Sequence, residues 1–483
     1  MAITVYDTMR RSAVELTPRD AGQVSMYLCG PTVYNYVHIG NARTIIWYDE
    51  IRRYLSYRGY SVTFVMNYTD VDDKIIERAN IEGISPDAVS SKYAQAFQED
   101  MSALKVSPPD ILALATTHIE DMIKAIEGLV ERGVAYESGG DVFFAVERFE
   151  DYGKLSGRSL EDMRAGERVE PNAAKRHPMD FALWKAAKEG EPSWSSPWGP
   201  GRPGWHIECS VMSTKYLGMG FDIHGGASDL IFPHHENEIA QAEALTDTKP
   251  FVGHWMHAGL VQMGSEKMSK SLGNFVLARD ALEHFSGEVV RYWALAGSYR
   301  SQITFSDSSM NDAAQAYERW KTFLSSARHA LGDEMPEPDP DVRRSDAQTG
   351  EFASGYIQRF IDAMDDDFNS AEAFAVVHEL VKEGNKVLDA AQRGEAEPKA
   401  ELLELVKDFH EITGVLSFGF SEEAANSELI GGLVEYLLEL RDKAREEKVF
   451  ARADEIRDRL QDMGVIIEDT PAGPRWRVGS ASV

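Results

Sequence analysis

Two short segments carry residues of the types that handle phosphate. His38-Ile39-Gly40-Asn41 lies between an apolar run and a predicted helix, and Lys267-Met268-Ser269-Lys270-Ser271 is a compact, doubly basic segment. A helix N-terminus offers free N–H groups and a positive dipole end to an anion, and lysine adds mobile positive charge. The two segments therefore predict a site for the phosphates of a nucleotide. The plainer alternatives are a structural histidine and a solvated lysine–serine turn.

A third set of residue types suits a metal ion. The chain has only two cysteines, and a histidine and a glutamate lie four residues apart in a predicted helix, on the same face. Two thiolates, an imidazole and a carboxylate form a donor set that suits zinc. These residues are Cys29, Cys209, His234 and Glu238, and His235 and Glu236 compete for the last two roles. Because the donors come from distant segments, buried unreactive thiols and a core histidine remain alternatives.

The elements that must position these residues begin with a strand–helix–strand unit. Residues 24–30 (VSMYLCG) read as a buried strand closed by glycine, and residues 60–66 (YSVTFVM) as a second strand. Between them, Ile45, Tyr48, Ile51 and Leu55 repeat at helical spacing, which predicts a helix from residue 39 to about residue 58. Such a unit implies a parallel sheet that binds its ligand at the carboxyl ends of the strands.

The rest of the chain predicts further regions. Residues 75–135 are mostly helical by pattern, and residues 138–204, rich in Gly, Pro and Trp, are predicted to be an irregular insertion in a nucleotide fold. Residues 221–224 predict a returning strand, and a helix is expected from residue 233. Beyond residue 271 the pattern predicts amphipathic helices, with an acidic linker over 332–350, a bundle over 351–418 and a small terminal sheet formed by 465–468 and 476–478.

Composition limits the possible classes of protein. The 483 residues suit roughly three domains of about 150 residues. The net charge of −29 argues by itself against a polyanionic partner, although a local basic face can exist on an acidic protein. The first sixteen residues contain no apolar block, and no apolar run reaches the roughly 18 residues of a membrane span. We therefore expect a cytoplasmic protein without disulfides and without membrane contact.

Over nearly its whole length the chain resembles the bacterial cysteinyl-tRNA synthetase family, a class I aminoacyl-tRNA synthetase family. The resemblance is carried by MYLCGPTVYNYVHIGNART, NYTDVDDKIIERAN, PMDFALWK, GRPGWHIECSVM, FDIHGGASDLIFPHHENEIAQ, KMSKSLGNF, YRSQI and MDDDFNSAEA. Where the family's phosphate motif usually has a second histidine, this chain has Asn41, which can donate a hydrogen bond but carries no charge.

The resemblance implies a set of functional residues and cofactors. One zinc ion per chain would be held by Cys29, Cys209, His234 and Glu238 and would bind the sulfur of the substrate cysteine. Catalysis would depend on His38, Asn41, Lys267 and Lys270, and ATP with Mg²⁺ would be bound by these residues together with Gly40, Ser269 and Ser271. The substrate-binding residues would be Thr69, Trp205, His224 and Asp229. ATP and L-cysteine would form cysteinyl-adenylate, from which the cysteinyl group passes to tRNA(Cys).

The resemblance also implies the organisation of the chain. The expected fold is α/β: a Rossmann-like parallel-sheet catalytic domain with an insertion, then an α-helical bundle and a small α+β anticodon-binding domain. The expected boundaries are 1–125 and 201–250 for the two catalytic halves, 126–200 for the insertion, 251–315 for the lysine loop and stem-contact region, 316–420 for the bundle and 421–483 for the terminal domain. A monomer is expected.

Two other functions remain open at this stage. One is the related mycothiol-pathway ligase that joins cysteine to an amino sugar, which lacks the terminal anticodon region. The other is a non-catalytic tRNA-binding paralogue. The roughly 200 residues after Ser271 argue against the first, and the intact phosphate and zinc residues argue against the second.

Overall fold

The computed structural model describes residues 2–160, 174–263, 266–267, 276–339, 342–344, 354–392, 399–420, 433–434, 436–445, 449–462, 465–470 and 473–478. The chain forms two compact units, Met1–Phe418 and Gly419–Val483. In the described part of the chain, no helix combines the length and the hydropathy that a bilayer span requires.

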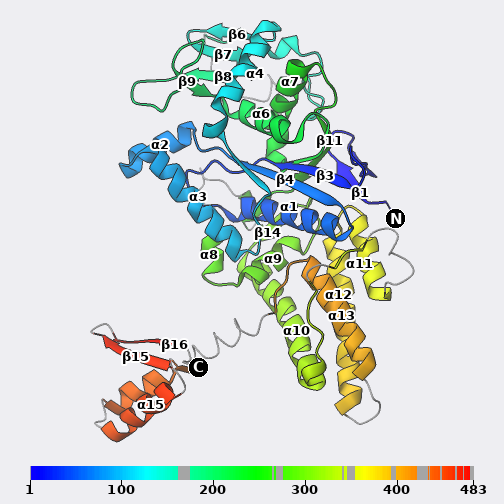
Figure 1. Ribbon diagram of the computed structural model, residues 1–483, viewed down its shortest axis with the longest axis vertical. Helices are drawn as coiled ribbons and strands as arrows, with labels where there is room; N and C mark the ends of the chain where they lie inside the picture. Colours follow the sequence, from blue (N-terminus) through cyan, green and yellow to red (C-terminus); the bar gives the residue numbers. More distant parts are fainter. Residues whose placement is uncertain are drawn as a thin grey trace. The chain divides into compact units, whose positions relative to one another are not determined.

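A five-stranded parallel sheet forms the centre of the first unit (Figure 1). Its strand order is β11-β10-β3-β4-β5. The strands are β3 (Gln23–Leu28), β4 (Ser61–Tyr68), β5 (Ile111–Leu114), β10 (Phe221–Ala227) and β11 (Val252–Ala258). The chain leaves β3 towards β4 on one side, while β10 pairs with β3 on the other, so a crevice opens at the carboxyl ends of β3 and β10.

The predicted strand–helix–strand unit is confirmed. Helix α1 (Ile39–Tyr57) joins β3 to β4, and Gly59 follows it with a φ of 87°, a conformation that glycine adopts without strain. The predicted strand at residues 221–224 is also present, as β10. However, β5 was missed, because its four residues lie within a stretch that otherwise forms helices α2 (Asp73–Glu82), α3 (Pro86–Ala103) and α4 (Ile119–Glu131).

The prediction that residues 138–204 are irregular is wrong. They contribute three strands of a four-stranded antiparallel sheet, in the order β6-β7-β8-β9. These strands are β6 (Ala135–Ser138), β7 (Asp141–Phe144), β8 (Phe181–Ala186) and β9 (Gly201–Pro203). They are short, and long connections separate β7 from β8 and β8 from β9, so no alternating pattern is long enough to reveal them. The chain then enters α6 (Trp205–Leu217), which returns it to the central sheet.

Helices predominate in the later part of the first unit, as predicted. They are α8 (Ala278–Leu282), α9 (Gly287–Leu295), α10 (Asp307–Leu331), α11 (Gly355–Asp365), α12 (Ser370–Gln392) and α13 (Lys399–Val415). A small sheet accompanies them, in which β12 (Val261–Met263) pairs with β13 (Glu266–Lys267) and β14 (Ile303–Phe305). Near the N-terminus, β1 (Thr4–Asp7) and β2 (Ser12–Glu15) form a hairpin.

The described residues of the second unit include a helix and a hairpin. Helix α15 (Phe450–Asp462) precedes β15 (Val465–Thr470) and β16 (Gly473–Val478), which pair in antiparallel register with Ile467 opposite Trp476. Its buried apolar residues are Val434, Leu438, Leu460 and Val465. The predicted terminal sheet is therefore confirmed.

Candidate active site

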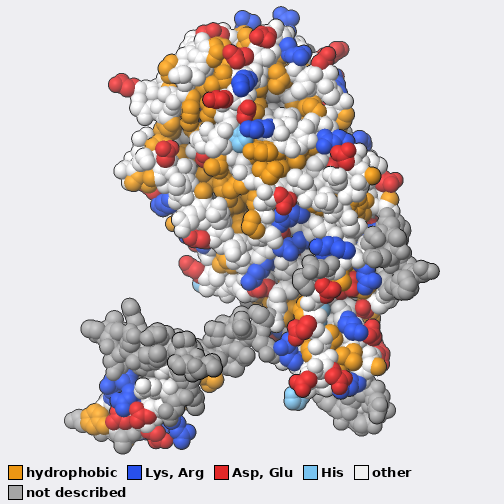
Figure 2. All heavy atoms as spheres, viewed as in Figure 1, with side chains coloured by type: hydrophobic (Ala, Val, Ile, Leu, Met, Phe, Trp, Pro, Cys, Tyr) orange, Lys and Arg blue, Asp and Glu red, His pale blue; other side chains and the backbone are white. Residues whose placement is uncertain are grey.

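A cavity of about 310 Å³ lies at the carboxyl ends of β3 and β10. Its walls bring together five of the residues singled out from the sequence: Cys29, His38, Asn41, Trp205 and Asp229. In Figure 2, hydrophobic side chains gather on the face in view, while acidic and basic side chains are interspersed over the rest of it. Because it lies at the carboxyl ends of the neighbouring strands β3 and β10, the cavity is where a doubly wound fold binds its ligand.

His38 both caps a helix and forms part of the cavity wall. It has extended backbone angles at the N-cap of α1, and its Nδ1 accepts the N–H of Asn41 at 3.2 Å. A Cβ on Gly40 would lie 3.1 Å from that same nitrogen, so a side chain there would press on the imidazole. His38 thus caps the helix and also lines the cavity, so the N-terminus of α1 opens on the cavity.

The lysine segment begins and ends near this helix. Lys267 lies in β13, opposite Gln262 of β12, and the chain returns at Val276, whose carbonyl accepts the Ile39 N–H at 2.9 Å. Leu277 forms an antiparallel bridge with His38. The other predicted residues of this segment, Ser269, Lys270 and Ser271, lie outside the described residues, and the side chain of Lys267 is not described.

The four sequence-predicted metal ligands converge. One ligand atom from each of Cys29, Cys209, His234 and Glu238 can be chosen so that all lie within 4.8 Å of one another. The Cys29 thiol donates to Glu238 Oε1 at 3.4 Å, and His234 Nε2 lies 3.1 Å from the same oxygen. The last three residues of this group are buried, whereas Cys29 is partly exposed to the cavity. The group can hold a metal ion, and we call it the two-cysteine set.

The helix that was predicted to carry both His234 and Glu238 starts later than expected. Residues Ile231–His235 form an irregular turn in which Phe232 has non-helical angles, and α7 runs over Glu236–Thr246. The proline expected in the first helical turn therefore precedes the helix. His234 and Glu238 still converge on one side, as their spacing of four predicts.

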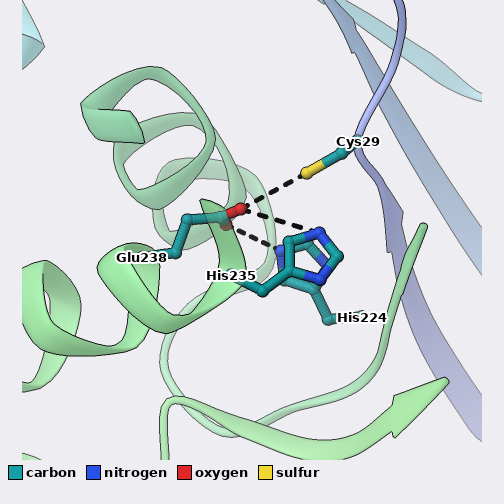
Figure 3. Close-up of side chains that lie close together, drawn as sticks. All are labelled: Cys29, His224, His235 and Glu238. Carbon is teal, nitrogen blue, oxygen red and sulfur yellow. Dashed lines mark hydrogen bonds and ion pairs between the residues drawn. The ribbon is translucent and has the colours of Figure 1, made fainter. Parts of the chain in front are cut away.

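A second, overlapping group shares Cys29 and Glu238 but takes two other histidines (Figure 3). His224 Nε2 lies 2.8 Å from Glu238 Oε2, and His235 Nε2 lies 3.8 Å from Glu238 Oε1. We call this group the two-histidine set, after the two imidazoles that face the carboxylate. His235 Nδ1 is already bonded to His257 Nε2 at 2.7 Å. Glu236, the other candidate carboxylate, instead accepts the Ser156 N–H at 2.8 Å.

Burial sets the charge state of these donors. It raises the pKa of the Cys29 and Cys209 thiols and lowers the pKa of His234 and His235. The folded chain by itself therefore favours thiols that keep their protons and imidazoles that are neutral. Neutral imidazole is the form that binds a metal, and a bound cation is the natural means of stabilising a thiolate here. The donor set thus fits a metal ion.

The predicted substrate residues divide into two pairs. Trp205 and Asp229 line the cavity, and the Trp205 ring stacks on His234 with ring centroids 4.1 Å apart. Thr69 and His224 are buried and do not line it. Thr69 Oγ1 donates instead to Glu208 Oε2 at 2.6 Å. Three residues after Thr69, Asp72 caps α2 by accepting the Lys74 N–H.

Sequence reasoning missed His206 and Glu208. His206 Nδ1 lies 2.9 Å from His234 Nδ1, so the two rings share a proton and His206 orients the predicted ligand. Glu208 is buried with Thr69, and burial raises the pKa of its carboxyl well above the usual range. Both residues lie between Trp205 and Cys209, so their place in that segment was the only available signal.

Comparison with known proteins assigns the chain to a family. The family described as "tRNA synthetases class I (C) catalytic domain" matches residues 15–315. A "DALR domain" matches residues 359–420, and a "Cysteinyl-tRNA ligase anticodon binding domain" matches residues 431–477. The chain is 48% identical to a cysteine–tRNA ligase of Heliobacterium modesticaldum, over 99% of this chain and all of that protein. This chain belongs to the cysteine–tRNA ligase family.

Other relatives agree with this assignment. A cysteine–tRNA ligase of Brevibacillus brevis is 49% identical, again over 99% of this chain and all of the relative. The fold resembles a Mycobacterium tuberculosis methionyl-tRNA synthetase solved with methionyl-adenylate, with a TM-score of 0.57 and 17% identity over 82% of this chain and 89% of that one. As a member of the cysteine–tRNA ligase family, the chain is a class I aminoacyl-tRNA synthetase, and the α/β fold expected from its sequence is confirmed.

Proposed function

We propose that this chain ligates L-cysteine to tRNA(Cys) with ATP, through a cysteinyl-adenylate intermediate. One observation carries the proposal: a single cavity joins a metal-binding group that contains both cysteines of the chain to the N-terminus of α1. The first feature suits recognition of a thiol, and the second suits binding of phosphate.

We propose that the two-cysteine set holds one zinc ion per chain. Thiolate sulfur is a donor that zinc prefers, and this set offers two sulfurs where the alternative offers one. His234 has the neighbour that an oriented ligand requires, because His206 meets its other nitrogen. When bound, zinc supplies a Lewis acid that ionises a thiol far more readily than an alcohol, which favours cysteine over serine.

The chain's own residues then position the reacting groups. Asp229 in the cavity wall would accept the ammonium group of the amino acid, and Trp205 would close the side of the pocket next to His234. The N-terminus of α1, with His38 and Asn41, would bind ATP phosphates, and Lys267 and Lys270 would neutralise the departing pyrophosphate. No protein nucleophile takes part, because the cysteine carboxylate itself attacks the α-phosphate. Catalysis consists of positioning and charge stabilisation.

The nucleic-acid partner is proposed from the second half of the chain. The matches to a DALR domain and to an anticodon-binding domain support contact with a tRNA along both regions. Helix α15 contributes Arg452, Arg457 and Arg459, and several acidic residues are interleaved with them. Mg²⁺ would accompany ATP as a substrate. We propose that the enzyme acts as a monomer.

The test is an ATP–pyrophosphate exchange assay with cysteine and with serine, followed by charging. The proposal expects exchange that depends on cysteine, about 10⁴-fold or more selectivity over serine without editing, and cysteine transferred to tRNA(Cys). Elemental analysis should find one zinc per chain. Transfer to an amino sugar in place of tRNA would indicate the related ligase, and exchange supported equally by serine would refute the proposal.

A further inference from the structure

One buried cation has no role in the site described above. Arg43 on α1 is fully buried, and its guanidinium donates to two backbone carbonyls: Nη1 to Gly259 at 2.7 Å and Nη2 to Ser298 at 3.0 Å. Within the described residues, its Nε has no hydrogen-bond partner. Burial lowers the pKa of Arg43 to about 10, so the group remains charged at neutral pH. Such burial is unfavourable, so its position demands an explanation.

The two carbonyls belong to a tight junction. Gly259 joins β11 to β12, and its N–H donates to the Tyr299 carbonyl at 2.7 Å. A Cβ on Gly259 would lie 2.4 Å from the Ser301 carbonyl oxygen, so the two chain segments meet without space for a side chain. Two residues later, Val261 begins β12, which pairs with β14 on one side and with the Lys267 strand on the other. Arg43 therefore binds the base of the incoming strand of the lysine segment.

The outgoing end of the same segment is attached to the same helix. The Ile39 N–H donates to the Val276 carbonyl, and the Ala278 N–H donates to the Val37 carbonyl, both at 2.9 Å. These bonds flank His38. The segment that contains Lys267 thus departs from a junction held by Arg43 and returns to the backbone at the start of α1.

We propose that Arg43 is a positioning residue. It fixes β12, the incoming strand of the lysine segment, relative to His38, so that the lysine segment and His38 can contact the same ATP molecule. The inference rests on the proposed function for its catalytic consequence. Arginine suits this role because its planar fork can donate to two carbonyls from separate chain segments. A lysine at this position keeps the charge but offers a single nitrogen, which cannot reproduce the fork.

The test compares Arg43→Lys and Arg43→Met with Arg53→Met. Arg53 lies on the same helix but binds Asp49 and Ser107, away from the junction. For Arg43→Lys we expect kcat/KM for ATP in pyrophosphate exchange to fall by about 10- to 100-fold, as small misplacements do, while the KM for cysteine and the zinc content stay within two-fold, roughly. Arg53→Met should leave kcat/KM for ATP unchanged.

Hydrogen exchange gives a readout that does not depend on activity. In Arg43→Lys, the amides of Gly259 and of β12 should exchange faster, whereas those of β4 should not change. Unchanged kcat/KM for ATP would overturn the inference, as would a rise in the KM for cysteine or a loss of zinc as large as the fall in kcat/KM for ATP, or unchanged exchange at β12. If the unaltered chain showed no cysteine-dependent activity, the proposed function would fail, while faster exchange at β12 would still support the anchoring role of Arg43.

Discussion

Replacing Cys209 with serine tests which set of residues holds the metal. Cys209 is 1% exposed, and serine is nearly isosteric with cysteine, so the fold should be retained. Four-ligand zinc sites bind with about 10–16 kcal/mol, so one ligand accounts on average for about 2.5–4 kcal/mol; at about 1.4 kcal/mol per factor of ten, its loss weakens zinc binding by about 60- to 700-fold. Cysteine-dependent pyrophosphate exchange should fall with zinc occupancy.

The measurement is a competition titration against a chromophoric zinc chelator at neutral pH, with reductant present. His234→Gln should weaken zinc binding as much as Cys209→Ser does. His235→Gln is the matched control, because His235 contacts Glu238 only at 3.8 Å and should have the smaller effect of a residue near the ligands, about ten-fold. If His235→Gln released more zinc than Cys209→Ser, the alternative set in Figure 3 would hold the ion and the reasoning would be wrong.

Three further changes have defined outcomes. Lys270→Ala should slow pyrophosphate exchange by about 10²- to 10³-fold while cysteine binding, measured by calorimetry, stays unchanged; a near-normal rate would exclude the role in pyrophosphate release. Thr69→Val removes the hydrogen-bond donor to buried Glu208 and should lower the free energy of unfolding by about 1–3 kcal/mol in urea titrations, and no loss would show that the bond contributes nothing. Burial raises the pKa of Asp408, which accepts a hydrogen bond from Ser354, from 3.8 to about 6. The folded state therefore binds the proton more tightly, and this part of the stability, complete below pH 3.8, is lost as the pH rises through about 6. In Asp408→Asn, the fall in Tm over that interval should be smaller, and an identical fall would contradict the assignment.

The parts of the fold that could be predicted are those with long, regular patterns. The unit formed by β3, α1 and β4 was predictable because an uninterrupted helical repeat lies between two apolar runs. By contrast, β5 has four residues and the strands of the antiparallel sheet have three to six, too few for periodicity to separate them from loops. The pairing of β5 with β4 and of β8 with β7 also joins residues that are far apart in the sequence, so only the folded chain identifies it.

The candidate site shows the same division. The spacing of His234 and Glu238 predicted that they share a face, and the structure brings them to 3.1 Å. The contacts of His206 with His234 and of Thr69 with Glu208 could not be predicted, because these residues come together only through tertiary contacts. Likewise, Arg43 resembles any polar residue on a helix, and its role becomes visible only when Gly259 and Ser298, more than two hundred residues away, close around it.

The carboxyl end of helix α1 also contacts α11. Its last turns carry Tyr54, whose hydroxyl donates to Asp365 on α11 at 2.6 Å, and Arg58 just beyond the helix forms a buried ion pair with the same carboxylate. A straight helix rotates by about 100° per residue. One added or deleted residue within α1 would therefore turn Tyr54 and Arg58 away from Asp365, or else turn the amino end of the helix away from the cavity. An insertion or deletion within α1 is consequently compatible with this fold only if the contacts at both ends of the helix change together.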